Sequence, residues 1–165
     1  MAVAEIERRV LEALDGLGIP YVRHEHPPVA TVEAAEKHWG GLRGAHCKNL
    51  FLRNYKGNHH YLVIAPVTRG IDLKRLTADL GEDRLSFASA ERLKRRLGVE
   101  PGSVSPFGLI NDEAREVRVV CDAALRSGQT LGFHPNVNTA TLEISLADFE
   151  KFLAWRGNAV RWLEL

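Results

Sequence analysis

Lys48 and Asn49 place a cation and an amide just before an apolar run, Leu50-Phe51-Leu52. A second apolar run, 61–65, follows a turn rich in polar residues, so the two runs predict a β-hairpin. A lysine held on a strand points in one direction and can position an anionic or polar substrate group. The alternative is an exposed lysine on a solvated hairpin.

A loop with the pattern Gly-x-x-x-Pro forms a second candidate. It reads Gly102-Ser103-Val104-Ser105-Pro106 and follows a predicted helix. Glycine leaves its first position without a side chain, and its backbone N–H groups could hold a carbonyl or an oxyanion. A simple connecting loop would show the same pattern.

His134 is the third candidate, within Gly132-Phe133-His134-Pro135-Asn136. Pro135 favours an extended backbone at His134. A histidine held in this way could donate a hydrogen bond or transfer a proton. A histidine that lines the core or the surface is the alternative.

Other residues suggest metal binding or nucleophilic catalysis. His24-x-His26 and the pair His46-Cys47 could supply zinc ligands, but neither Cys-x-x-Cys nor His-Glu-x-x-His spacing occurs. We therefore expect no metal and no other cofactor.

A nucleophilic triad could combine Cys47 or Ser103 with His134, and Lys48 could lower the pKa of the Cys47 thiol. Strand alternation puts Cys47 and Lys48 on opposite faces, which favours a structural thiol.

Composition is that of a soluble globular protein. The 165 residues are 45% hydrophobic and 26% charged, and we expect one domain over 1–165. No apolar run approaches the roughly 20 residues of a membrane helix, and the N-terminus is acidic and helical. We therefore expect a cytoplasmic protein with no membrane partner, whose two cysteines are reduced.

Positive charge is concentrated in one region although the net charge is only +1. Residues 43–75 contain seven Lys or Arg against one acid, a local balance of +6. Such a region could meet phosphates, although charge alone favours the alternative of a solvated hairpin with exposed lysines.

The periodicity predicts helices and strands that are interspersed without regular βαβ spacing. Helices are expected over 2–17, 32–39, 73–80, 90–97 and 146–155. Strands are expected over 19–24, 46–54, 61–65, 84–88, 117–121, 139–144 and 160–163, with loops over 99–108 and 127–138. This order favours an α+β fold with a mixed, mostly antiparallel curved sheet and surrounding helices.

Taken together and in order, these stretches resemble the YbaK-like aminoacyl-tRNA deacylase superfamily, which includes the editing insertion of bacterial prolyl-tRNA synthetase. The resemblance extends over roughly residues 5–163 and is greatest to the free-standing ProXp-ala (PrdX) branch. It rests on 48–53, on 84–89 leading into 97–109, and on 132–136.

The resemblance implies roles for individual residues. Lys48, Gly102 and His134 correspond to catalytic positions: the lysine would hold the tRNA 3′ end, the glycine loop the ester, and the histidine would line the pocket. The substrate-binding candidates are Asn49, Ser103, Val104, Ser105, Pro106 and Thr31, the last also expected to begin the helix over 32–39.

The resemblance also implies an activity and partners. The chain would deacylate Ala-tRNA(Pro) in trans, contacting the acceptor stem and 3′ end, with prolyl-tRNA synthetase as a second candidate partner and no DNA. Three alternatives stay open: another small mischarged amino acid such as Cys-tRNA(Pro), a non-catalytic module that binds tRNA or synthetase, and a metal hydrolase built on His24 and His26.

Overall fold

The computed structural model describes residues 4–28, 45–128 and 130–165. Thr31 and the helix expected over 32–39 lie outside the described residues.

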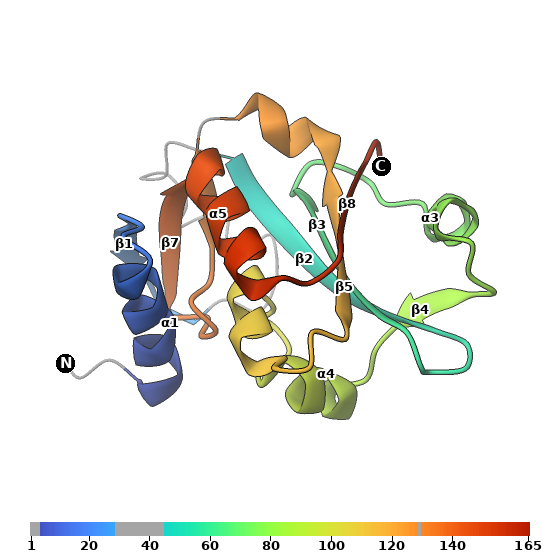
Figure 1. Cartoon of the computed structure of the whole chain (residues 1–165), viewed down its shortest axis with the longest axis horizontal. Coiled ribbons are helices and arrows are strands. Elements are labelled where there is room, and N and C mark those ends of the chain that lie inside the picture. Colours follow the sequence, from blue (N-terminus) through green and yellow to red (C-terminus); the bar gives the residue numbers. More distant parts are fainter. Residues whose placement is uncertain (1–3, 29–44, 129) are drawn as a thin grey trace.

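An eight-stranded mixed sheet forms the centre of the molecule (Figure 1). Its strands run in the order β1-β7-β6-β2-β3-β5-β8, and β4 pairs with β2 beside this path. In the described residues, four strand pairs are antiparallel and three are parallel. The strands are β1 Val22–Glu25, β2 Ala45–Asn54, β3 His60–Pro66, β4 Leu85–Phe87, β5 Val117–Asp122, β6 Thr130–Phe133, β7 Ala140–Ser145 and β8 Val160–Leu163. The expected α+β fold with a mixed sheet is confirmed.

Helices surround this sheet, and their ends follow local signals in the sequence. They are α1 Glu5–Gly16, α3 Leu73–Leu80, α4 Ala90–Leu97 and α5 Leu146–Arg156, with 3₁₀ turns η2 Pro106–Asn111 and η3 Ala123–Ser127. Ser89 and Ser145 accept hydrogen bonds from backbone amides of the helices that they precede, so each serves as an N-cap. None of the helices in the described ranges is long and apolar enough to cross a membrane.

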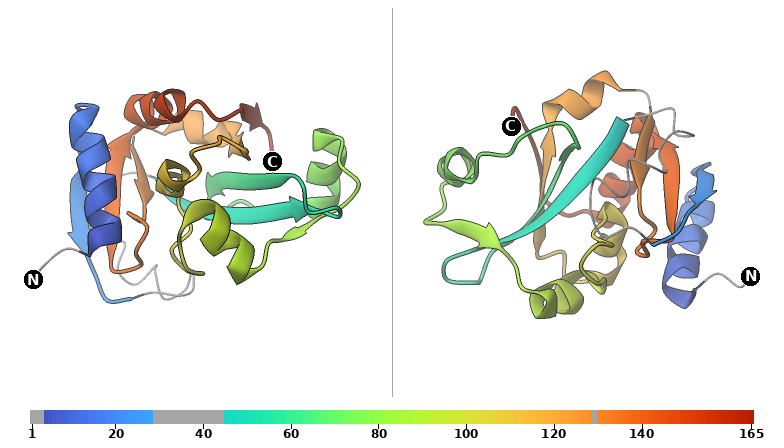
Figure 2. Two further views of the ribbon diagram at one scale, coloured as in Figure 1. Left: turned by 60° about the horizontal axis from the view of Figure 1, so that its bottom comes forward. Right: turned by 180° about the vertical axis from the view of Figure 1, so that it is seen from behind.

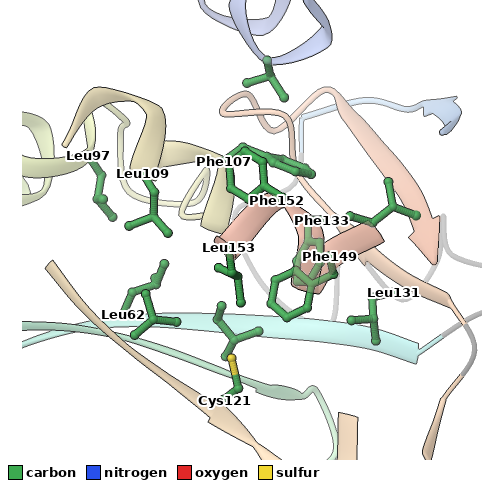
Figure 3. Packing of buried hydrophobic residues seen from close by; sticks show 14 of the residues in the cluster. Leu62, Leu97, Phe107, Leu109, Cys121, Leu131, Phe133, Phe149, Phe152 and Leu153 are labelled. Atoms are coloured by element: carbon green, nitrogen blue, oxygen red, sulfur yellow. The ribbon is translucent and has the colours of Figure 1, made fainter. Parts of the chain in front are cut away.

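The two faces of the sheet carry two separate cores. The main core gathers around Phe107, Phe133, Phe149 and Phe152 (Figure 3). The second core lies on the opposite face, between α3 and strands β2, β3, β4 and β5, and its buried residues are Leu52, Tyr61, Val63, Leu76, Leu85 and Val120. Figure 2 shows α3 and β4 at the end of the molecule far from α1.

Along one of its edges, β2 pairs with two different strands in succession. One edge pairs with β3 from Cys47 to Arg53. The other edge pairs first with β6, at Ala45 and His46, and later with β4, at 52–54. No described strand pairs with that edge over 47–51, although Ala88 N–H donates to Phe51 O at 2.9 Å. We call this gap between β6 and β4 the sheet division.

Two predictions about the chain after α4 were wrong in part. The expected loop over 127–138 contains strand β6, which forms because β7 and β2 pair with it across the fold. The expected loop over 99–108 ends in η2, where the Ser105 side chain accepts a hydrogen bond from the first turn. The first strand begins at Val22 rather than Ile19, because pairing with β7 starts at Val22 and the Ile19 amide donates to Leu14 O instead.

Candidate active site at the sheet division

Lys48 and His134 lie at the same level of two neighbouring strands. β2 and β6 run parallel, with His46 paired to Gly132. Lys48 comes two residues after His46, and His134 comes two residues after Gly132. Directly paired strand residues share a face, so alternation assigns Lys48 to the face of His46 and Gly132, and His134 continues on that face just past the end of β6.

The imidazole of His134 is held in one tautomer. Its Nδ1 lies 2.8 Å from the carbonyl oxygen of Ala140, and a carbonyl can only accept, so Nδ1 carries the proton. Burial lowers the pKa of His134, the bond to Ala140 opposes this, and His26 lowers the pKa further. The neutral ring at pH 7 therefore presents Nε2 as a hydrogen-bond acceptor.

His26 packs against His134 and is itself held by the protein. The two ring centroids are 5.8 Å apart in an edge-to-face arrangement. His26 Nε2 lies 2.9 Å from Thr141 Oγ1, and its Nδ1 lies 2.9 Å from the Pro27 oxygen. The pair His24-x-His26 thus belongs to the β1–β7 ladder beside the site.

The described residues form no cluster of side chains that could ligate zinc. His24 Nε2 lies 2.6 Å from Glu143 Oε1, a carboxylate on the neighbouring strand. Across the described ranges, no group of three or more His, Cys, Asp or Glu side chains could hold a metal ion.

Lys48 and Asn49 lie on opposite faces at the sheet division. Leu50 and Leu52 pack into the second core, so alternation places Lys48 on that face. Lys48 is half-buried, and no carboxylate in the described part of the chain forms an ion pair with it. Asn49 belongs to the face of Phe51, and its buried Oδ1 has no hydrogen-bond partner among the described residues.

The Gly-x-x-x-Pro loop contributes fewer free donors than the sequence suggests. Gly102 has a φ of 89°, which glycine adopts without strain. The Ser103 amide donates to Glu100 O at 3.0 Å, so it is not available to a substrate. Gly102, Val104 and Ser105 keep amides for which no bond is found among the described residues.

Ser105 and Pro106 make contacts that stabilise the loop itself. Ser105 Oγ accepts from the Phe107 amide at 3.1 Å, and Ser103, Ser105 and Pro106 are buried. Pro106 begins η2, where a residue without an N–H is well accommodated.

Asn136 joins the loop to the histidine segment, a role that sequence reasoning missed. It has a φ of 63° and is 3% exposed. Its Nδ2 donates to Phe107 O at 3.3 Å, while its buried Oδ1 finds no partner within the described part of the chain. Asparagine tolerates a left-handed backbone better than most residues, and this was the available signal.

Cys47 is not poised as a nucleophile. Burial raises the pKa of its thiol to about 12, and the side chain packs against the main core. The lowered pKa considered from the neighbouring Lys48 is therefore wrong, and the structural interpretation of Cys47 agrees with its packing.

The basic region over 43–75 carries less free charge than its composition indicates. Arg69 pairs with Asp122 at 3.0 Å, and Arg75 lies 3.8 Å from Asp79. Arg53 donates to the backbone oxygens of Asn54 and Tyr55. Arg43 lies outside the described residues.

Comparison with known proteins gives a consistent result. The family model described as "Aminoacyl-tRNA editing domain" matches residues 26–152. The "Prolyl-tRNA editing protein ProX" of Acetoanaerobium sticklandii is 44% identical over 161 residues, covering 98% of each chain. The "Prolyl-tRNA synthetase associated domain-containing protein 1" of Bos taurus is 36% identical over 162 residues, covering 96% of this chain and 94% of the relative.

Solved structures share the fold. One, described as a candidate trans-editing enzyme for prolyl-tRNA synthetase, superposes with a TM-score of 0.73 at 22% identity, covering 99% of each chain.

Proposed function

Because the chain belongs to the aminoacyl-tRNA editing domain family, we propose that it hydrolyses the ester of a mischarged tRNA, with Ala-tRNA(Pro) as substrate. Two observations support the proposal: β2 and β6 pair next to Lys48 and His134, and the Asn136–Phe107 hydrogen bond links the histidine segment to the residue that follows the Gly-x-x-x-Pro loop. The relative from Acetoanaerobium sticklandii, named for prolyl-tRNA editing, supports the choice of tRNA.

The reaction is a simple hydrolysis. Water adds to the carbonyl carbon, the bond from that carbon to the ribose oxygen breaks, and the free amino acid leaves a tRNA with an intact terminal ribose. An aminoacyl ester is already activated, so orientation of the water and stabilisation of the oxyanion supply the help that is needed.

Each group at the site has a role suited to its chemistry. The cation of Lys48 would hold the phosphate or ribose at the tRNA 3′ end. The amides of Gly102, Val104 and Ser105 would bind the ester oxygen. The unprotonated Nε2 of His134 would accept a hydrogen bond from the attacking water or from a ribose hydroxyl.

Discrimination against proline would depend on size. One methylene changes binding by only about 1–3 kcal/mol, so steric exclusion from a small pocket must contribute most of the selectivity. This is the second sieve of an editing scheme, in which the smaller wrong product enters and the larger correct one does not.

The test is a deacylation panel with Ala-tRNA(Pro), Cys-tRNA(Pro) and Pro-tRNA(Pro). We expect rapid release of alanine and retention of proline. Cysteine released faster than alanine would change the assigned substrate. Binding of tRNA without release of any amino acid would instead identify a non-catalytic binding module.

The same proposal includes the setting and the partners. The protein would act in the cytoplasm on the acceptor stem and 3′ end, with prolyl-tRNA synthetase as a further partner. A pull-down of the synthetase in the presence and absence of tRNA separates direct association from association through tRNA.

A further inference from the structure

Phe87 is a large apolar side chain left in solvent beside the candidate site. It is 62% exposed, although it is the last residue of β4 and is paired directly with Leu52 of β2. Leu85, two residues earlier, is buried in the second core, so alternation puts Phe87 on the second-core face. Lys48 belongs to the same face.

The position of Phe87 distinguishes it from other exposed apolar side chains. Single exposed apolar residues are common on protein surfaces. Phe87, however, lies at the rim of the sheet division, where the next residue, Ala88, bonds to Phe51 O. Leu52, the partner of Phe87, comes four positions after Lys48 in β2, which corresponds to about 13 Å along the strand.

Resting on the proposed function, we propose that Phe87 is a stacking platform for an unpaired base just upstream of the terminal adenosine of the substrate tRNA. The 3′ end of a tRNA is single-stranded, so its bases offer π-faces that an exposed phenyl ring can cover. With the terminal nucleotide at Lys48, the preceding nucleotides can extend along β2 towards Phe87.

The charged residues near Phe87 are compatible with the binding of RNA, which is negatively charged. The two carboxylates just before β4 are engaged by protein donors. Glu82 accepts from Tyr61 Oη at 2.5 Å and lies 2.7 Å from His59 Nδ1. Asp83 accepts from the amides of Tyr55 and Arg84.

Arg84 adds a cation at the start of this strand. Its side chain is exposed and, in the described part of the chain, has no carboxylate partner. It can approach the phosphates that connect the stacked nucleotides.

Two substrates separate stacking from catalysis. One is the aminoacyl-tRNA, and the other is the same amino acid esterified to adenosine, which has no upstream base. Phe87→Ala should lower kcat/KM for the tRNA about tenfold, mainly through KM, and leave the aminoacyl-adenosine unchanged. Phe87→Trp should retain activity on the tRNA, whereas Phe87→Leu, which keeps an apolar side chain without a ring, should not.

Tyr55→Ala is the matched control, because Tyr55 is 70% exposed but lies in the hairpin turn beyond β2. It should change neither rate. Equal losses on both substrates with Phe87→Ala, or an unchanged rate on the tRNA, would overturn the stacking proposal while leaving the deacylase proposal intact.

A binding measurement does not depend on activity. Stacking on Phe87 should quench 2-aminopurine placed at either of the two positions before the terminal adenosine, and Phe87→Ala should abolish the quench. If the wild-type protein quenches but hydrolyses neither substrate, the function proposal fails and the stacking proposal stands. Wild-type quenching that Phe87→Ala leaves unchanged contradicts stacking.

Discussion

Asn136 donates a hydrogen bond from Nδ2 to the carbonyl oxygen of Phe107, 3.3 Å away, and so ties the segment after β6 to the loop after α4. The first segment carries His134 and the second carries Gly102. Together with the edge-to-face contact between Phe107 and Phe133, this hydrogen bond therefore contributes to the relative position of the two groups.

Replacing Asn136 should separate activity from folding. Asn136→Gly keeps a residue that accepts the φ of 63° but removes the bond to Phe107. We expect a loss of about 1 kcal/mol in stability and at least a tenfold loss in kcat/KM, because small displacements at a site are costly. Urea unfolding and single-turnover deacylation measure the two effects.

Asn136→Asp is the companion variant. It has the same shape but places an oxygen against Phe107 O, so it should be no more active than Asn136→Gly. Full activity in both variants would remove Asn136 from the positioning role.

Lys48 should matter for activity and little for stability. Lys48→Ala removes a half-buried cation with no carboxylate partner among the described residues, so no buried acid loses its counter-ion. We expect kcat/KM to fall about a hundredfold with a circular dichroism melting curve close to that of the wild type. Lys56→Ala, an exposed lysine of the hairpin turn, serves as control and should stay within about twofold.

The pH dependence of hydrolysis should report on His134. Burial places its pKa below the ordinary value of 6.5, with a further lowering from His26. Activity that needs an unprotonated Nε2 is therefore retained below pH 6.5 and is lost as pH falls through the lowered pKa. A pH–rate profile should show this acid limb.

His26→Gln removes a neighbouring charge and should move the acid limb to higher pH. The amino group of the substrate titrates equally in both enzymes, so only the difference between the two profiles is informative. Identical profiles would show that His134 does not control the limb.

His60 should make stability depend on pH. Its pKa is lowered to about 4, first by burial and then by the positive charges of Arg96, Arg92 and Arg53. Arg92 Nη1 lies 3.1 Å from His60 Nε2. The unfolded chain takes up the proton near pH 6.5, so the stabilisation is complete above that value and is lost as pH falls towards 4. The loss should reach about 3 kcal/mol.

Urea unfolding at pH 7 and pH 4.5 tests this, with His60→Gln as the non-titrating comparison. The variant should lose less stability between the two pH values than the wild type. Equal losses would assign the pH dependence to other groups.

Local signals predicted the helices well. Ser89 and Ser145 each bond within the first turn that follows, so both the cause and the effect lie within a few residues. Strand β6 could not be found in this way. Its four residues become a strand because β7 and β2 pair with them across the fold.

The sequence singles out candidate site residues but not the contacts between the segments that carry them. Lys48, Gly102 and His134 stand out by type and neighbours. The hydrogen bond from Asn136 to Phe107, by contrast, depends on how two distant segments meet in space. Periodicity carries no information about such contacts.

The sheet division also determines which changes of length β2 can tolerate. Three strands fix its register: β3 on one edge, with β6 and β4 on the other. An insertion or deletion of one residue between His46 and Leu52 would exchange the two faces from that point on. A change between His46 and Lys48 would turn Lys48 towards the main core and Asn49 away from it, so in this strand side-chain spacing is constrained as strictly as side-chain identity.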